Sequence, residues 1–454
     1  VEEHVADVPV VVLDGGDSLI APQHLELDER SLNQRRIKAE LIADGFLLSN
    51  TDAMALGATD WTLGSDWVRK MVDDKKLPVL AANLSCDGQS PYPAGKVVER
   101  GGRRLGIVGV TLGEVEGCDV SDPGPALIAA LKDLGPVDIS IALLPTRTAP
   151  ELAKITTTDL DFDIGFDARG SHTREGGEKK GSLWMYGVGN KGKSIGILTL
   201  GFVDGAATWE PAGQVDAIQV RVDRIQDRLD ATQKRAETEA DPDRKKLFEK
   251  QVASYETQLA TEMQHRDAAK VDGGATNTLR NAETPLDRSI ANHVATEALV
   301  VAAKGLIGAE QAAGSPNTAP HQVPAGPYAG SDACATCHRP EFLQWAKTGH
   351  ARAYQTLYAD KRHTDNDCFS CHVTGAGESG GPKSPVDMQG FRDVQCEACH
   401  GPARAHAGNP GDAALKPNRD PGVETCSKCH DGDRDGGRFD LEHYRPKIVH
   451  QSSR

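Results

Sequence analysis

The chain has 454 residues and a formal net charge of −15. This length exceeds what one ordinary hydrophobic core fills, so we expect two or three domains. The acidic balance argues against a nucleic-acid groove or an anionic membrane surface as the main partner, because both favour basic patches. The sequence contains no run of about 18 apolar residues, so no transmembrane segment is predicted.

The first two hundred residues alternate apolar runs of strand length with amphipathic stretches of helical spacing. The pattern predicts strands at 8–13, 77–83, 104–110, 137–143 and 162–166, and helices that include 35–44 and 151–156. After Lys179 two apolar runs flank a Gly-Asn-Lys-Gly turn, which is typical of an antiparallel strand pair. We therefore expect an α/β layered sandwich over residues 1–212.

A charged, helix-favouring segment follows at 213–270. Apolar residues recur at helical spacing on both sides of an Ala-Asp-Pro-Asp turn, and Pro242 is expected to begin the second helix of an antiparallel hairpin. The hairpin is either an insertion that packs locally, as such hairpins usually do, or a docking or self-association surface. Residues 271–307 complete the N-terminal region, and the Ala-, Gly- and Pro-rich stretch 308–327 predicts a linker.

Eight of the ten cysteines lie in four copies of the pentad Cys-x-x-Cys-His. The copies read CATCH, CFSCH, CEACH and CSKCH, and all lie within the final unit, residues 328–454. The other two cysteines, Cys86 and Cys118, either form a disulfide or are two small buried residues. Burial is the preferred interpretation, because nothing near either cysteine marks a reactive thiol.

The final unit has few long apolar runs, so its side chains cannot build an ordinary core. In Cys-x-x-Cys-His both thiols can bond to the vinyl groups of a haem, and the adjacent histidine then lies under the iron. Zinc and thiol redox chemistry are alternatives, but a zinc ribbon needs no histidine directly after each second cysteine. We therefore predict a mostly helical or irregular multihaem cytochrome c domain whose core is filled by four c-type haems.

The predicted haem-attachment residues are Cys334, Cys337, Cys368, Cys371, Cys396, Cys399, Cys426 and Cys429. The predicted proximal iron ligands are His338, His372, His400 and His430. The second axial ligand of each iron decides between electron transfer and chemistry. The histidines that remain in this unit are His350, His363, His406, His443 and His450.

Residues 328–454 resemble the tetrahaem cytochrome family typified by the electron acceptor of hydroxylamine oxidoreductase. The motifs that carry the likeness are CATCH followed by KTGHARAY, then CFSCHVTG, CEACHGPARAH and the final KIVH. In that family the histidines that match His350, His406 and His450 are distal ligands, and one haem can stay five-coordinate. His363 matches no family position, so it is either a fourth distal ligand or a surface residue.

Residues 8–203 resemble the calcineurin-type metallophosphoesterase domain of periplasmic 5'-nucleotidases, through VVVLDGGDSL, DAMALGATDW, LPVLAANL and RRLGIVGVT. That family activates water with two metal ions held by Asp, Asn and His. Here Asp17 is retained, but the family's Gly-Asn-His-Glu segment reads Gly57-Ala58-Thr59-Asp60, and only a displaced His172 remains from the later histidines. The resemblance implies a degenerate domain that keeps the fold as a scaffold without phosphatase activity.

The leading hypothesis is a periplasmic or extracellular cytochrome, freed of any signal peptide, that exchanges electrons with redox partner proteins. It involves no nucleic acid, and enzymatic activity is the less expected outcome. A second hypothesis is a polymeric filament, in which His4, His24 or His321 binds the haem of a neighbouring chain. A third is a haem-based reductase that acts on a small nitrogen or sulfur species at a five-coordinate iron.

Overall fold

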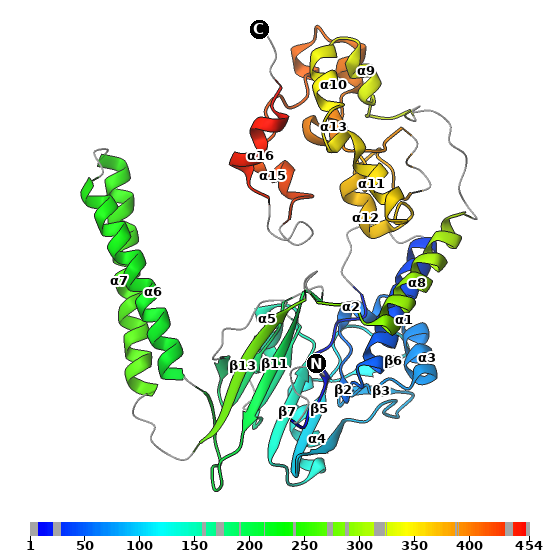
Figure 1. Ribbon diagram of the computed structural model, residues 1–454. Helices are drawn as coiled ribbons and strands as arrows, with labels where there is room; N and C mark the ends of the chain where they lie inside the picture. Colours follow the sequence, from blue (N-terminus) through cyan, green and yellow to red (C-terminus); the bar gives the residue numbers. More distant parts are fainter. Residues whose placement is uncertain are drawn as a thin grey trace. The chain divides into compact units, whose positions relative to one another are not determined.

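The computed structural model forms two compact units, which are considered separately (Figure 1). The first comprises Val1–Ala21 and Phe46–Ala291, and the second comprises Pro22–Gly45 and Asn292–Arg454. None of the helices within the described part of the chain is long and apolar enough to cross a membrane. The structure describes residues 8–20, 29–156, 160–168, 177–189, 192–212, 214–238, 242–269, 276–286, 290–312, 323, 325–385, 388, 390–431 and 439–450.

The first unit is built around a six-stranded sheet with the strand order β4-β5-β7-β8-β10-β9. The three inner pairings are parallel and the two outer pairings are antiparallel. The strands are β4 (Gly95–Arg100), β5 (Arg103–Gly109), β7 (Ile139–Leu144), β8 (Ile164–Asp167), β9 (Glu178–Lys180) and β10 (Leu183–Tyr186).

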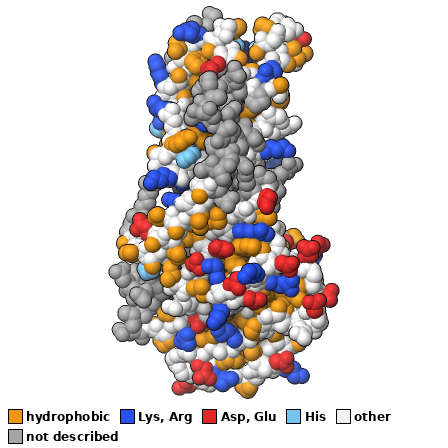
Figure 2. Space-filling model, turned by 90° about the vertical axis from the view of Figure 1, so that its right-hand side faces the viewer, with side chains coloured by type: hydrophobic (Ala, Val, Ile, Leu, Met, Phe, Trp, Pro, Cys, Tyr) orange, Lys and Arg blue, Asp and Glu red, His pale blue; other side chains and the backbone are white. Residues whose placement is uncertain are grey.

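On the face that Figure 2 shows, acidic and basic side chains are interspersed over the lower part of the view.

Both faces of this sheet are covered. Every residue of β7 is buried, as expected for a parallel strand between two layers. Ile141 and Leu143 pack with Leu279 of a second sheet, while the alternate Ala142 packs with Leu127 of a helix. The covering elements are the sheet β11 (Ser194–Gly201), β13 (Asn277–Pro285) and β12 (Trp209–Pro211), and the helices α4 (Pro123–Leu134) and α5 (Ala149–Ile155). These layers confirm the predicted α/β sandwich.

Two of the predicted strands are wrong. Of 8–13, only the end contributes to β1 (Leu13–Asp14), which pairs with β2 (Ala53–Met54). Within 77–83, Leu80, Ala81 and Ala82 donate to the carbonyls of three separate segments, at Met54, Pro93 and Gly109. Because a strand needs one continuous partner, this run yields only an isolated bridge, and β3 begins later, at Leu84–Cys86.

The antiparallel pair predicted after Lys179 is also wrong. Its first run is β10, which pairs with β8 and β9 in the six-stranded sheet. Its second run is β11, which pairs along its whole length with β13. This partner follows the helical hairpin in the sequence, so a local turn pattern could not reveal it. The ladder spans eight residue pairs and therefore outweighs a short hairpin pairing.

The helical hairpin is present as α6 (Gln214–Thr238) and α7 (Pro242–Ala269), and α7 begins at the predicted proline. Figure 1 shows the two helices side by side. Val222, Leu229 and Ala236 are buried at seven-residue intervals along α6, which is the spacing of a packed helix seam. The first five residues of the predicted linker 308–327 belong to α8 (Val294–Ala312), and residues 313–322 and 324 lie outside the described part of the chain.

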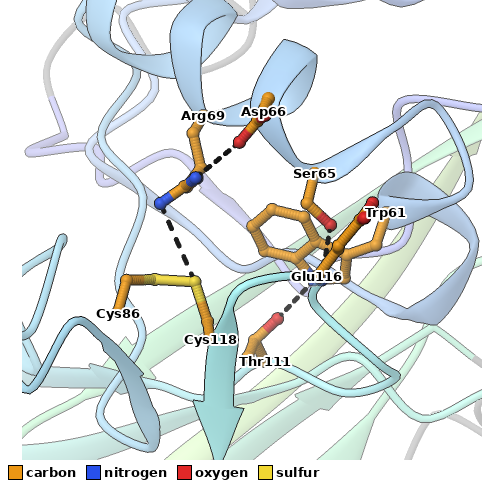
Figure 3. The surroundings of a disulfide bond; sticks show 8 residues. All are labelled: Trp61, Ser65, Asp66, Arg69, Cys86, Thr111, Glu116 and Cys118. Carbon is orange, nitrogen blue, oxygen red and sulfur yellow. Dashed lines mark hydrogen bonds and ion pairs between the residues drawn. A yellow bond between two sulfur atoms is a disulfide. The ribbon is translucent and has the colours of Figure 1, made fainter.

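A disulfide joins Cys86 to Cys118, so the preferred interpretation of two small buried thiols is wrong. The cysteines lie opposite each other on β3 and β6 (Cys118–Val120), which form a separate two-stranded antiparallel sheet. Figure 3 shows that Arg69, held by Asp66 at 2.6 Å, directs its guanidinium to the Cys118 sulfur. The pairing depends on a strand register that sequence spacing does not reveal. A disulfide is typical of an oxidising compartment.

The second unit consists of short helices around a small core. Among the residues that the structure describes here, one buried cluster contains seven members, Tyr328, Tyr354, Leu357, Phe369, Val373, Met388 and Phe391. A core of this size is small for more than a hundred residues, as the sequence predicted. Besides α1 (Glu29–Leu48) and α8, the helices are α9 (Ser331–Ala335), α10 (Arg339–Trp345), α11 (Ala353–Ala359), α12 (Asn366–His372), α13 (Cys396–His400), α14 (Arg404–Gly408), α15 (Val423–Ser427) and α16 (Leu441–Ile448).

Candidate haem site

Each pentad lies on or directly after a single helical turn. CFSCH ends α12 and CEACH forms α13, while CATCH and CSKCH continue from α9 and α15. In the first pentad the backbone N–H of His338 donates to the carbonyl of Cys334 at 2.8 Å. The same bond joins His430 to Cys426 at 2.9 Å. Residues four apart share one side of a helix, so each histidine lies on the side of its first cysteine.

Of the eight pentad cysteines, Cys337 is exposed and the other seven are half-buried. The first and third pentads are neighbours, since the thiols of Cys334 and Cys396 lie within hydrogen-bonding reach of each other. Ser331, at the start of α9, lies 3.3 Å from the sulfur of Cys396. Groups attached at these two pentads would therefore lie side by side.

Three of the four pentad histidines face a second histidine. The ring centroids are 6.4 Å apart for His338 and His406, and 6.3 Å apart for His430 and His350. For the third pair, His400 and His450, the separation is 6.1 Å. The second member of each pair is one of the three histidines for which the family resemblance implied a distal role.

The spacing of these pairs fits one iron between two imidazoles. A metal–nitrogen bond is about 2 Å long and the nitrogen lies about 1 Å from its ring centre, so two rings that share a metal ion have centroids about 6 Å apart. The centroid distances of all three pairs agree with this value. Aromatic rings that only pack together also lie about 4.5–7 Å apart, and Phe439 and Tyr444 do so at 6.0 Å. The assignment therefore rests on the spacing together with the composition of each pair, a pentad histidine and a histidine that the motifs singled out.

Hydrogen bonds and burial prepare several of these rings for metal binding. Nδ1 of His372 lies 2.6 Å from the carbonyl of Ala353, and Nδ1 of His400 lies 2.6 Å from that of Asn418. A carbonyl can only accept, so each Nδ1 carries the proton and Nε2 is left free to bind a metal. Burial lowers the pKa of His350 and His450, and the partner histidine lowers each pKa further. Low pKa values favour the neutral ring that metals require.

His372 differs from the other pentad histidines. Among the described residues, no ring contact pairs it with a second histidine. His363, the undecided fourth candidate, stacks on Tyr358 with an interplanar angle of 8°. Its Nδ1 is buried without a hydrogen-bond partner in the described part of the chain. The exposed His443 lies 2.8 Å from Lys447. His4, His24, His172 and His321 lie outside the described residues.

Helix α1 is a component of this site that the sequence did not indicate. It lies between β1 and β2 of the first unit in the chain, but one of its faces packs on the segment that leads into the CFSCH pentad. Gln34 donates to the carbonyl of Thr364 at 2.9 Å, and Asn366 donates to Ser31 at 2.8 Å. Lys38 forms ion pairs with Asp365 at 2.5 Å and with Asp367 at 2.6 Å.

Asp17, the aspartate retained from the phosphoesterase motif, forms a hydrogen bond and an ion pair within the first unit. One oxygen of Asp17 accepts the backbone N–H of Thr59 at 2.8 Å, and the other pairs with the guanidinium of Arg147 at 2.8 Å. Arg147 follows β7 and was not singled out from the sequence. Asp60 is fully buried, and burial, followed by the nearby charge of Asp17, raises the pKa of Asp60 to about 8. A protonated carboxyl is a poor metal ligand.

Comparison with known proteins identifies the domain that carries the pentads. Residues 333–401 match the family model described as cytochrome c554 and c-prime. Cytochrome c-554 of Nitrosomonas europaea is 33% identical over 137 residues, an alignment that covers 23% of this chain and 57% of that protein. The chain therefore spans little more than half the length of this curated relative. Its C-terminal region is a cytochrome c554 domain, as the motifs predicted.

The first unit is similar to solved phosphoesterase structures. A 5'-nucleotidase precursor from Thermus thermophilus aligns with a TM-score of 0.35 and 18% identity, over 44% of each chain. The calcineurin-like phosphoesterase YfkN from Bacillus subtilis aligns with a TM-score of 0.34 and 16% identity, over 45% of this chain and 75% of that one. A likeness at this level does not extend to activity.

Proposed function

We propose that this protein is an extracytoplasmic electron carrier that holds four c-type haems. The observation that carries the proposal is the set of three histidine pairs, each with the centroid spacing of two imidazoles on one iron. The eight pentad cysteines would hold the haems as thioethers, and His338, His372, His400 and His430 would be proximal ligands. His406, His350 and His450 would be the distal ligands of the first, fourth and third haems. A haem iron supplies one-electron redox chemistry when bound.

Two imidazoles suit electron transfer. A haem iron held by one such pair would keep the same two protein ligands in both oxidation states, so little rearrangement would accompany the transfer. The contact between the first and third pentads supports close spacing of their haems, which favours transfer between them. The disulfide supports export from the cytoplasm. Electrons would enter and leave through redox partner proteins.

The first test is the stoichiometry of haem and of ligand binding. We expect the purified protein to contain four haems per chain by the pyridine haemochrome assay, with a matching mass increase after denaturation. We expect carbon monoxide to bind one ferrous haem per chain, at His372. Fewer than four haems would contradict the assignment of the pentads. Binding at none would show that His363 or another histidine occupies the second ligand position at the haem of His372.

The carbon monoxide result also decides the second candidate function, a haem-based reductase. The observation that favours it is His372, which faces no second histidine in the described part of the chain. An open iron there would admit a small nitrogen or sulfur species. The filament hypothesis was motivated by a shortfall of distal histidines within one chain. Under the proposed ligation that shortfall is one ligand, for the iron at His372, which a neighbouring chain would supply.

We further propose that the first unit is a pseudo-phosphoesterase that serves as a scaffold. Arg147 neutralises Asp17 and occupies the carboxylate that a metal ion would need. We expect no hydrolysis of p-nitrophenyl phosphate above background with added Mn²⁺, and the rate should be compared with that of a competent 5'-nucleotidase under the same conditions. Metal-dependent turnover by this protein would refute the proposal.

A further inference from the structure

Glu397, the first variable residue of the third pentad, has a buried carboxylate. Only 4% of the residue is exposed. Three backbone N–H groups donate to it, from Ala329 at 2.9 Å and 3.1 Å, from Gly330 at 2.8 Å and from Ala403 at 2.7 Å. A buried carboxylate is costly unless its oxygens accept hydrogen bonds, and here both oxygens do. Its position between two cysteines gives no sign of this role in the sequence.

The three donors belong to two segments that carry the ligands of a different haem. Ala329 and Gly330 directly precede α9, which leads into CATCH and His338. Ala403 is the N-cap residue of α14, which contains His406. The carboxylate thus joins the start of the proximal segment to the start of the distal segment of the first haem. The rings of His338 and His406 face each other at 6.4 Å.

Of the similar side chains, only glutamate can accept hydrogen bonds from the backbone N–H groups of both segments. Oε1 accepts from Ala403 and Oε2 accepts from Gly330, while Ala329 contacts both oxygens. Glutamine has the same shape, but its amide presents two donors on one side and must turn them toward an N–H group. Aspartate keeps both acceptors but is shorter by one methylene, so it cannot reach both segments.

The same two segments have a second connection. Arg404 donates from its backbone to the carbonyl of Pro327 at 3.0 Å and from its side chain to that of Tyr328 at 2.7 Å. These bonds are expected to keep the domain folded when the Glu397 carboxylate is lost. Glu397 would then affect the fine placement of the segments rather than the fold as a whole.

We propose that Glu397 is a positioning residue that holds His406 against His338, so that the third pentad maintains the axial ligation of the first haem. The inference rests on the proposed function, because it assumes that these histidines bind one iron. Loss of the carboxylate frees the start of α14, and His406 then gives way to carbon monoxide at that iron.

The test counts the carbon monoxide bound by ferrous Glu397→Gln. We expect it to keep four haems per chain but to bind two equivalents of carbon monoxide instead of one, and to lose one low-spin signal in electron paramagnetic resonance. Glu378→Gln is the matched control, because Glu378 lies in the same unit, is exposed and pairs only with Lys428 among the described residues. It should bind one equivalent.

A double variant distinguishes a positioning role of Glu397 from a general destabilisation of the domain. His406→Ala should bind two equivalents, and Glu397→Gln combined with His406→Ala should also bind two, because both changes free the same iron. One equivalent in Glu397→Gln with full haem content, or three in the double variant, would overturn the inference. If Glu397→Gln does not accumulate, Glu397→Asp is interpreted by the same criteria. A wild-type protein without haem would instead refute the proposed function.

Discussion

Replacing His450 with alanine is expected to free the iron of the third haem and to leave the fourth haem unchanged. His450 lies closer in sequence to CSKCH than to CEACH, but its ring faces His400 at 6.1 Å. Loss of one imidazole removes a donor that stabilises the ferric state. We expect one additional equivalent of bound carbon monoxide and a rise in the midpoint potential of that haem on the order of 0.1 V. Spectroelectrochemical titration measures the shift.

A control tests the assignment of His450 to the third haem. In a Cys396→Ala/Cys399→Ala variant, which should lack the third haem, adding His450→Ala should change neither carbon monoxide binding nor the remaining potentials. In a Cys426→Ala/Cys429→Ala variant the same substitution should still free one iron. The reverse pattern would mean that His450 serves the fourth haem and that the pairing in the structure is wrong.

Replacing Lys38 with methionine is expected to lower the free energy of unfolding of the second unit by about 2–3 kcal/mol. The change leaves Asp365 and Asp367 without the cation that both contact at short distance. Removing one partner of a buried ion pair leaves the remaining charge less compensated. The penalty is reduced because Asp365 keeps its ion pair with Arg362 at 2.9 Å and because Asp367 is partly exposed. Denaturant titration followed at the haem Soret band reports this unit. Lys70→Met, which removes an exposed pair with Asp74 on α3 (Ser65–Lys75), should cost less than about 0.5 kcal/mol.

The pH dependence of the Lys38 effect follows from the pKa shifts. Burial alone would raise the pKa of Asp365, but the Lys38 charge outweighs burial and lowers it below the usual 3.8. Burial alone would lower the pKa of Lys38, but Asp367 and Asp365 raise it above 10.5. The contribution of Asp365 to the free energy of unfolding is complete above pH 3.8 and is lost as the pH falls through the depressed pKa of Asp365. The Lys38 contribution is complete below pH 10.5 and is lost as the pH rises through the raised pKa.

The difference between wild type and Lys38→Met should therefore be constant between about pH 5 and pH 9, because both groups keep their charges throughout this range. It should shrink in stronger acid and in stronger base. A difference that varied steadily across neutral pH would show that a histidine, rather than this ion pair, carries the effect.

Local patterns in the sequence predicted the elements that depend on local chemistry. The pentads lie on or directly after a helical turn of their own, and strands such as β5 and β7 are continuous apolar runs. The histidines after the pentads were recognised through the motifs around them. Which pentad each one faces was not predictable, because the pairs join segments as far apart as residues 350 and 430.

The features that the sequence missed depend on contacts between distant segments. Helix α1 joins the second unit because Lys38 and its neighbours meet residues more than 300 positions later. The disulfide depends on a strand register, and Arg147 reaches Asp17 from a loop after another strand. Glu397 occupies a position that Cys-x-x-Cys-His leaves undefined. In each case the residue type is common in proteins, and its contact partner becomes apparent only in the folded structure.

The histidine pairs 338–406, 350–430 and 400–450 overlap along the chain, which has a consequence for biogenesis. During export from the N-terminus the pentads emerge in numerical order, but under the proposed ligation their irons would be completed in another order. The first haem would gain its second ligand only after residue 406 has emerged, and the third only after residue 450. The second ligand of the fourth haem, residue 350, would have emerged before its pentad. A chain arrested after residue 430 and before residue 450 would then carry every haem and still lack a ligand at its third iron.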